Sequence, residues 1–75
     1  MRKVEISREP VELYRILKFE GLATSGGEAK HFIAEGRVSL NGQVETRKRK
    51  KIMSGDIIEF DNERILILLG QENHQ

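Results

Sequence analysis

The hydrophobic residues in the first half of the chain recur at helical spacing in two short segments. In the first segment, one helix face carries Leu13, Ile16 and Leu17. Pro10 suits the first position of this helix, because its fixed φ angle matches a helix and its missing N–H would have no partner there. Gly21 is the residue type that most often ends a helix in a left-handed conformation. The pattern therefore predicts a helix over about residues 10–20.

The second helical segment begins with a stronger signal. Ser25 is followed three residues later by Glu28, which is a capping box: each side chain accepts a hydrogen bond from an otherwise unpaired backbone N–H. The inward face of this helix carries Ala29, Phe32 and Ile33. Gly36 is placed to end it. Because only a few residues separate the two helices, we expect an αα-hairpin.

Alternation of apolar and polar residues predicts strands at the start of the chain and throughout its second half. Residues 3–6 place Val4 and Ile6 on one face, which we expect to point inward. Further strands are predicted at residues 38–40, 57–60 and 64–69, with turns at 54–56 and 61–63. The polar tail over residues 70–75 is expected to be frayed.

Asn41 and Gly42 form the strongest short-range signal for a β-hairpin. A two-residue turn at this point would place Val44 opposite Ser39, on the other face from Leu40. Because this register leaves Val44 outside the core, we expect a bulge or a longer loop instead.

Together these elements predict an α+β fold, in which a two-helix hairpin packs on a small, mostly antiparallel twisted sheet of four or five short strands. We expect one domain over residues 1–75, with a core over about residues 4–69. At 75 residues and 37% hydrophobic content, this core must be small. The chain has no cysteine to form disulfides or a cysteine zinc site, and no apolar run of the roughly 18 residues that a membrane span needs. We therefore expect a cytoplasmic protein.

The formal net charge of +1, from 13 Lys and Arg and 12 Asp and Glu, hides an uneven distribution. Residues 37–51 hold six of the basic residues beside a single acidic one, Glu45. Five of the six are consecutive, at residues 47–51, and such a run repels itself unless an anion lies against it. We favour a nucleic acid as that anion. The alternatives are an anionic membrane, an acidic protein, a nuclear-import signal, or a solvated loop that keeps strand edges apart.

The start of the second helix is another candidate anion site. Gly26 and Gly27 carry no side chains that would cover the backbone N–H groups of the first turn, and a phosphate binds well to such groups. Lys30 follows one turn later, and we expect it on the same side as Arg37. The alternative is that the two glycines only fit a tight connection between helices.

The aromatic residues bear on how such a surface would bind. The basic segment contains no ring, although proteins that bind single strands usually combine rings with cations. The spacing of Phe19, Phe32 and Phe60 predicts that they point inward, and Tyr14 is expected to be partly exposed. These features favour recognition of phosphates and shape on a folded nucleic acid.

Nothing in the sequence suggests catalysis. His31 is the only histidine inside a predicted element, His74 lies in the tail, and no acidic residue is spaced from either as a metal pair would need. We expect no catalytic activity, no metal and no cofactor.

The ordered motifs resemble the S4 RNA-binding domain family, in which two helices are followed by a small twisted sheet. The matching residues run through Gly21, Leu22, Ala23, Thr24, Ser25, Glu28, Ala29, Lys30, Phe32, Ile33, Gly36, Arg37, Val38, Leu40, Asn41, Gly42, Val44, Ile52, Gly55, Asp56, Ile57 and Ile58. The sub-pattern over residues 45–49 is similar to the small stand-alone bacterial S4-like proteins of the YbcJ type.

The resemblance implies contacts with RNA at the start of the second helix, at the entry to the first sheet strand and in the basic loop. The residues at these positions are Ser25, Lys30, Arg37, Arg47, Lys48, Arg49, Lys50 and Lys51. Many S4 domains have an arginine where this chain has Gly26, so we expect the binding surface to have moved towards residues 47–51. We treat these five residues as an extended segment whose alternate side chains point to opposite sides.

The functional hypothesis is a non-catalytic protein that binds structured RNA, ribosomal or transfer RNA, as a monomer and possible partner of the ribosome. The alternative is a protein-interaction or assembly module. Its support is residues 65–69, five successive apolar residues that would point to both faces of a strand.

Overall fold

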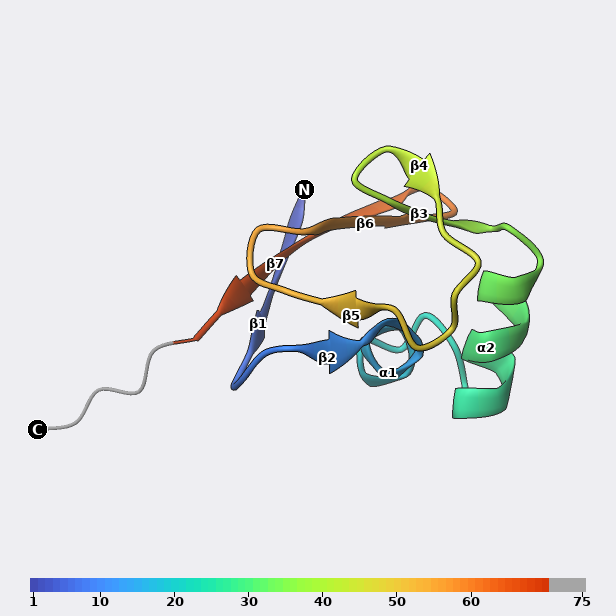
Figure 1. Cartoon of the computed structure of the whole chain (residues 1–75), viewed down its shortest axis with the longest axis horizontal. Coiled ribbons are helices and arrows are strands. Elements are labelled where there is room, and N and C mark those ends of the chain that lie inside the picture. The colour runs from blue at the N-terminus through green and yellow to red at the C-terminus, as the bar shows by residue number, and fades with distance from the viewer. Residues whose placement is uncertain (71–75) are drawn as a thin grey trace, which may run out of the picture.

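The computed structural model describes residues 1–70, which form two helices and seven strands. In chain order these are β1 (Arg2–Ile6), β2 (Val11–Glu12), α1 (Leu13–Phe19), α2 (Gly26–Ala34), β3 (Val38–Leu40), β4 (Gln43–Val44), β5 (Lys51–Ile52), β6 (Ile57–Phe60) and β7 (Glu63–Leu69). Figure 1 shows a five-stranded sheet as one layer, with α1 and a small second sheet on one side of it and α2 at one end.

The main sheet is mixed, with the strand order β1-β7-β6-β3-β4. β1 runs parallel to β7, with Val4 opposite Ile67, and the other three pairings are antiparallel. β2 and β5 form a separate antiparallel pair in which Val11 lies opposite Ile52. These pairings confirm the predicted fold class, a helical hairpin on a small, mostly antiparallel sheet.

The core lies between the inner face of the main sheet and the two helices. Val4 and Ile6 are buried, as predicted, and Ile65 and Ile67 of β7 are fully buried. The remaining buried apolar residues are Leu13, Ile16, Leu17, Ala23, Ala29, Ile33, Val38, Leu40, Ile52, Ile58 and Phe60. β7 is paired on both sides, and two of its five apolar residues are buried. Ile65 and Ile67 are therefore not available for the contact with another protein that the assembly hypothesis requires.

The first helix begins later than predicted, at Leu13 and not at Pro10. Val11 and Glu12 pair with β5 as a short strand instead. Glu12 is the N-cap, and its side chain forms no capping hydrogen bond. The prediction was wrong because pairing with a strand some 40 residues away, which the local pattern cannot reveal, outweighs the helical preference of Pro10 at N1.

Phe19 is exposed, with 67% of its surface accessible, so the prediction that it points inward was wrong. The helix ends at Phe19, and the chain then reverses at Gly21, whose φ angle is 75°. The N–H groups of Leu22 and Ala23 both donate to the carbonyl of Leu17, which brings Ala23 into the core beside the helix. The place that periodicity assigned to Phe19 is thus filled by the residues after the turn.

Both helices end in the same way, with a glycine in the left-handed conformation. After α2, Gly36 has a φ angle of 80° and its N–H donates to the carbonyl of Ile33, while Arg37 N–H donates to the carbonyl of Phe32. This pair of bonds is the Schellman motif, which satisfies the last carbonyls of a helix. Gly21 and Leu22 form the equivalent pair with Lys18 and Leu17 after α1. These ends confirm the predicted stop signals.

The start of α2 also follows the predicted capping box, with one difference. The hydroxyl of Ser25 accepts a hydrogen bond from Glu28 N–H at 3.0 Å. The carboxylate of Glu28 accepts from Thr24 N–H at 2.7 Å, one residue before the expected partner. The box therefore ties the connection between the helices to the first turn of α2.

The β3–β4 hairpin has a two-residue turn, so the expected bulge or longer loop was wrong. Asn41 and Gly42 have φ angles of 52° and 86°, and Ser39 lies opposite Val44. Val44 is 63% exposed as a result. Burying a valine side chain stabilises a protein by about 1.5–3 kcal/mol. Val44 nevertheless stays exposed, because the two-residue turn has the backbone twist that matches the flanking strands. The side-chain oxygen of Asn41 also accepts from Ile57 N–H at 2.9 Å, which fixes the turn against β6.

At the end of the described chain, Gly70 N–H donates to the carbonyl of Ile6 at 2.8 Å. The rest of the predicted frayed tail, residues 71–75, lies outside the described residues. Over residues 1–70, neither helix has the length and apolar character needed to cross a membrane.

The capping geometry predicts the effect of replacing Ser25. Ser25→Ala should lower the free energy of unfolding by about 1 kcal/mol, because Glu28 N–H loses its acceptor. Ser25→Asn, which retains a capping oxygen, is the matched control and should stay within a few tenths of a kcal/mol of the wild type. Urea unfolding of the three proteins measures this difference, and equal stabilities of the Ala and Asn variants would contradict the capping role.

Candidate nucleic-acid interface

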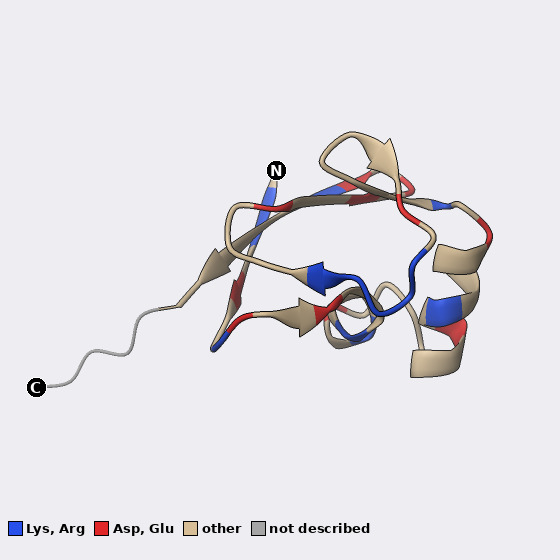
Figure 2. Cartoon of the chain, in the orientation of Figure 1, with Lys and Arg blue, Asp and Glu red and all other residues tan. Residues whose placement is uncertain are grey.

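The consecutive cations at residues 47–51, here called the basic loop, connect β4 to β5. Figure 2 shows them as a continuous basic segment that passes beside α1. Lys50 N–H donates to the carbonyl of Arg47 at 3.2 Å, so residues 47–50 form a turn. The expectation of an extended segment with alternating sides was therefore wrong. A turn presents its side chains in several directions, and each cation must be considered separately.

The basic loop is attached to the start of α1 by two backbone hydrogen bonds. Leu13 N–H donates to the carbonyl of Lys50 at 2.9 Å, and Tyr14 N–H donates to the carbonyl of Lys48 at 3.1 Å. The first N–H groups of a helix have no partner within the helix, and the N-cap Glu12 provides no side-chain acceptor. The loop carbonyls take that role, so the position of the loop is set by its backbone and does not depend on its charged side chains.

Each arginine of the basic loop pairs with a carboxylate. Arg47 donates from Nε and Nη2 to the two oxygens of Glu45, at 2.9 and 3.1 Å, and its backbone N–H donates to Glu45 at 3.0 Å. Arg49 Nη1 lies 3.3 Å from an oxygen of Glu12, which also pairs with Arg15. Hydrogen bonds from Arg47 lower the pKa of the Glu45 carboxyl below its ordinary value. Much of the charge of the two arginines is therefore compensated inside the protein.

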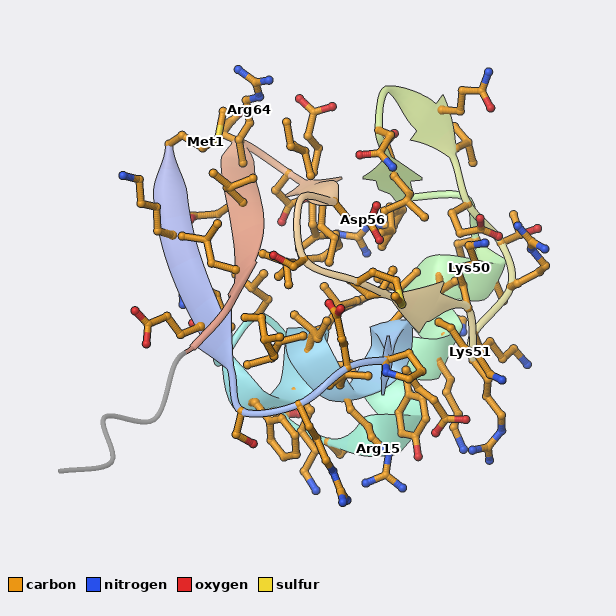
Figure 3. The ribbon with its side chains drawn as sticks, turned by 60° about the vertical axis from the view of Figure 1, so that its left-hand side comes forward. Met1, Arg15, Lys50, Lys51, Asp56 and Arg64 are labelled. Carbon is orange, nitrogen blue, oxygen red and sulfur yellow. The ribbon has the colours of Figure 1, made fainter. Side chains whose placement is uncertain are left out.

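The three lysines of the basic loop differ from the arginines. Within residues 1–70, Lys48, Lys50 and Lys51 form no ion pair. Lys48 and Lys51 are exposed and Lys50 is partly buried. Figure 3 places Lys50 and Lys51 together on one side of the molecule, away from Met1 and Arg64. These lysines are the loop cations whose charge is available to an external anion.

Tyr14 brings cations from three elements together. Its ring lies 4.6 Å from Lys30 Nζ, and 5.2 and 5.5 Å from the guanidinium carbons of Arg49 and Arg15. An aromatic face attracts such cations by about 0.5–1 kcal/mol at exposed sites. The sequence predicts only that Tyr14 is partly exposed and does not place it in the site. The signal that could have found it is its position in the first turn of the helix, which the loop caps.

Gly26 makes room for this ring. A Cβ atom built on Gly26 would lie 3.5 Å from Tyr14 Cε2, which is ordinary van der Waals contact. A long side chain at Gly26 would therefore have to compete with Tyr14 for the same space. The equivalent atom on Gly27 would meet only the Ser25 hydroxyl, at 3.9 Å. Gly26 therefore lies in a packing contact with Tyr14, and the space beside Gly27 is open.

Arg37 contacts a different set of residues from Lys30. Its guanidinium carbon lies 4.4 Å from the ring centroid of Phe32 and 5.3 Å from that of Phe60, and its nitrogens approach Asp61 at 3.4 Å and Glu35 at 3.7 Å. The contacts of Lys30 are with Tyr14. Within the described residues the structure joins Lys30 to the basic loop through Tyr14 and gives Arg37 a packing environment of its own.

The remaining candidate groups are simple to place. The hydroxyl of Ser25 is exposed and already accepts the capping bond. His31 lies 3.2 Å from Glu35 on the exposed side of α2, and His74 falls outside the described residues. Over residues 1–70 the structure contains no group of three or more His, Asp or Glu side chains that could hold a metal ion.

Two helices, a mixed sheet and a cation-rich loop define a small α+β module of the αL-motif type. The chain belongs to the S4 domain family, whose sequence model matches residues 4–68. This match confirms the family that the ordered motifs of the sequence predict.

The relatives are small proteins of nearly the same length. The chain is 42% identical over 69 residues to YbcJ of Escherichia coli, named as a candidate RNA-binding protein, with 91% of this chain and 99% of YbcJ covered. It is 33% identical over 58 residues to RlbA of Bacillus subtilis, named as a probable ribosome maturation protein, with 77% and 82% covered. The solution structure of Escherichia coli YbcJ, described as revealing an αL motif involved in RNA-binding, superposes with a TM-score of 0.69 over 91% of this chain and 87% of that one.

The pair formed by Glu45 and Arg47 predicts a pH dependence of stability. Because the pKa of Glu45 is lowered in the folded protein, the unfolded chain takes up a proton first as the pH falls below the ordinary value of 4.5. The stabilisation is therefore present above that pH and is lost as the pH falls further. Glu45→Gln should remove this part of the pH dependence, measured by urea unfolding at a series of pH values.

The control for this experiment is Glu5→Gln, since Glu5 is exposed and forms no ion pair within residues 1–70. It should leave the acid limb of the profile unchanged. Identical profiles for Glu45→Gln and the wild type would show that the pair with Arg47 does not stabilise the loop.

Proposed function

We propose that this protein binds structured RNA, ribosomal or transfer RNA, without catalysing a reaction. The contact surface consists of the basic loop and the start of α2. Membership of the S4 domain family and the names of YbcJ and RlbA support RNA as the ligand. The name of RlbA favours ribosomal RNA, and with it association with the ribosome, over transfer RNA. We further propose that the protein acts as a monomer in the cytoplasm.

The observation that carries this proposal is the set of three lysines that have no carboxylate partner among residues 1–70, on a loop whose backbone is held in place. Leu13 and Tyr14 hold that backbone through its carbonyls, so Lys48, Lys50 and Lys51 meet an RNA without first breaking an ion pair of the protein. A phosphate that replaces water around a lysine releases counterions, which is the main source of affinity for nucleic acids.

The arrangement of the rings supports recognition of phosphates and shape. Tyr14 has cations over its ring, so little of its face is open to stack on a base. Phe19 is exposed, but it lies at the opposite end of α1 from the basic loop contact. Proteins that bind folded RNA by its phosphates and 2′-hydroxyls need no stacking platform.

The loop lysines provide a direct test. Replacing Lys48, Lys50 and Lys51 together by Ala should weaken RNA binding and flatten the plot of log K against log salt by about two units, since each neutralised phosphate contributes a slope of about 0.7–0.9. The free energy of unfolding should stay nearly unchanged, because these side chains form no internal ion pair in the described chain. The measurement is a salt titration of binding to a structured RNA.

The matched control carries the same change of charge elsewhere, in the triple variant K3A/R8A/K18A, whose residues are exposed and lie outside the loop and α2. It should keep the wild-type slope. Equal slopes for all three proteins would exclude the basic loop as the binding site. Equal affinity of the wild type for RNA and for duplex DNA of the same length would reduce the function to general polyanion binding.

A further inference from the structure

A hollow of about 380 Å³ opens beside the basic loop, and neither Tyr14 nor α2 contributes to its lining. Its walls come from the β3–β4 hairpin, from the basic loop and from the residues that join β5 to β6. Cations, exposed apolar groups, amides and two carboxylates, those of Glu45 and Asp56, meet there. The side chains that matter most for a ligand are the cations Lys50 and Lys51, the apolar Val44 and Met53, and the amide of Gln43. Nothing in the core requires this combination, because none of these five side chains is buried.

We propose that this hollow receives one unpaired nucleotide of the bound RNA. The proposal rests on the proposed function and adds a site to it. The phosphate lies against the lysines, the face of the base lies against the apolar side chains, and the edge of the base lies against Gln43. A hollow of this volume is at the small end of ligand sites, which usually span about 300–1,000 Å³. It is large enough for a single nucleotide.

The charge of the hollow favours the phosphate at Lys50 and Lys51. Arg47 also lines it, but its guanidinium is paired with both oxygens of Glu45. The lining holds Arg47 and the two lysines against the carboxylates of Glu45 and Asp56, so it keeps a net positive charge. Because Arg47 is paired, the two lysines supply the cations that a phosphate can approach. Figure 3 labels both lysines and Asp56, which also lines the hollow.

The apolar part of the hollow suits the face of a base. Val44 and Met53 are 63% and 44% exposed, and Leu40 lines the hollow from the core side. The thioether of a methionine is polarisable and adapts to irregular partners, including the faces of rings. Two exposed apolar side chains beside cations match a ligand that is planar at one end and anionic at the other.

Gln43 is the group that can recognise the base. The other amide and acid on the wall are already used, because Asn41 Nδ2 donates to Asp56 at 3.0 Å and Asp56 accepts from Met53 N–H at 2.8 Å. Within residues 1–70 the side-chain amide of Gln43 has no hydrogen-bond partner. An amide offers both a donor and an acceptor, which is what the edge of an unpaired base needs.

The bonds on the wall also mean that the hollow exists before RNA arrives. Asn41 is held by Asp56 and by Ile57 N–H, so the hairpin and the turn after β5 are fixed to each other. A preformed site binds without the cost of ordering its walls.

The experiment uses two RNA probes with the same stem-loop, one fully paired in its stem and the other carrying a single bulged nucleotide, made with each of the four bases. The wild type should bind at least one bulged probe about five- to tenfold more tightly than the paired probe. Met53→Ala should reduce that ratio to near one, and Gln43→Ala should reduce the differences among the four bases. Neither variant should change affinity for the paired probe or its salt slope.

Leu69→Ala is the control, since Leu69 is 41% exposed at the end of β7 and does not line the hollow. It should keep the wild-type preference. A wild type that binds both kinds of probe equally, or a Met53→Ala variant that keeps the preference, would overturn the nucleotide site and leave the proposed function intact. Failure of the wild type to bind either probe in a salt-dependent way would overturn the proposed function itself.

Discussion

Two backbone hydrogen bonds, from the first N–H groups of α1 to carbonyls of the basic loop, determine where the loop cations lie. Leu13 and Tyr14 donate them to Lys50 and Lys48, over 2.9 and 3.1 Å. They complete a helix that has no side-chain cap, and they hold consecutive cations in a turn despite their mutual repulsion. The small sheet of β2 and β5 lies directly beside them and brings the two segments into register. The position of the loop therefore follows from the helix, and the charged side chains are left for other contacts.

The charges around this attachment divide by residue type. The guanidinium groups of Arg47 and Arg49 pair with carboxylates, as their forked geometry favours, while the loop lysines have no such partner in residues 1–70. The arginines thus shape the loop and the lysines carry its external charge. Tyr14 extends the surface to α2 by gathering Lys30 and Arg49 over its ring. A chain with a net charge of only +1 thus keeps three loop lysines that no carboxylate of residues 1–70 pairs with.

Much of the fold could be predicted from local chemistry. The glycine stops after both helices, the cap at Ser25 and the position of the hairpin at Asn41 depend on neighbouring residues, and the sequence predicts them correctly. The misplaced start of α1 and the exposure of Phe19 depend on β5 and on the chain after Gly21, which local periodicity does not report. The bulge expected before Val44 is absent, because the twist of the two-residue turn decides the register and leaves Val44 exposed. In the site, the basic loop was evident from composition, whereas the pairing of its arginines and the role of Tyr14 required knowledge of which segments meet.

We propose that RNA binds where the basic loop, Tyr14 and the start of α2 meet. Chemical-shift mapping of the backbone amides by NMR, during titration with a structured RNA, tests it most directly. The account predicts that the shifts concentrate at residues 48–51 and around Lys30, with the outer face of β7 unchanged. Shifts concentrated along β1 and β7, with the basic loop unaffected, would contradict it.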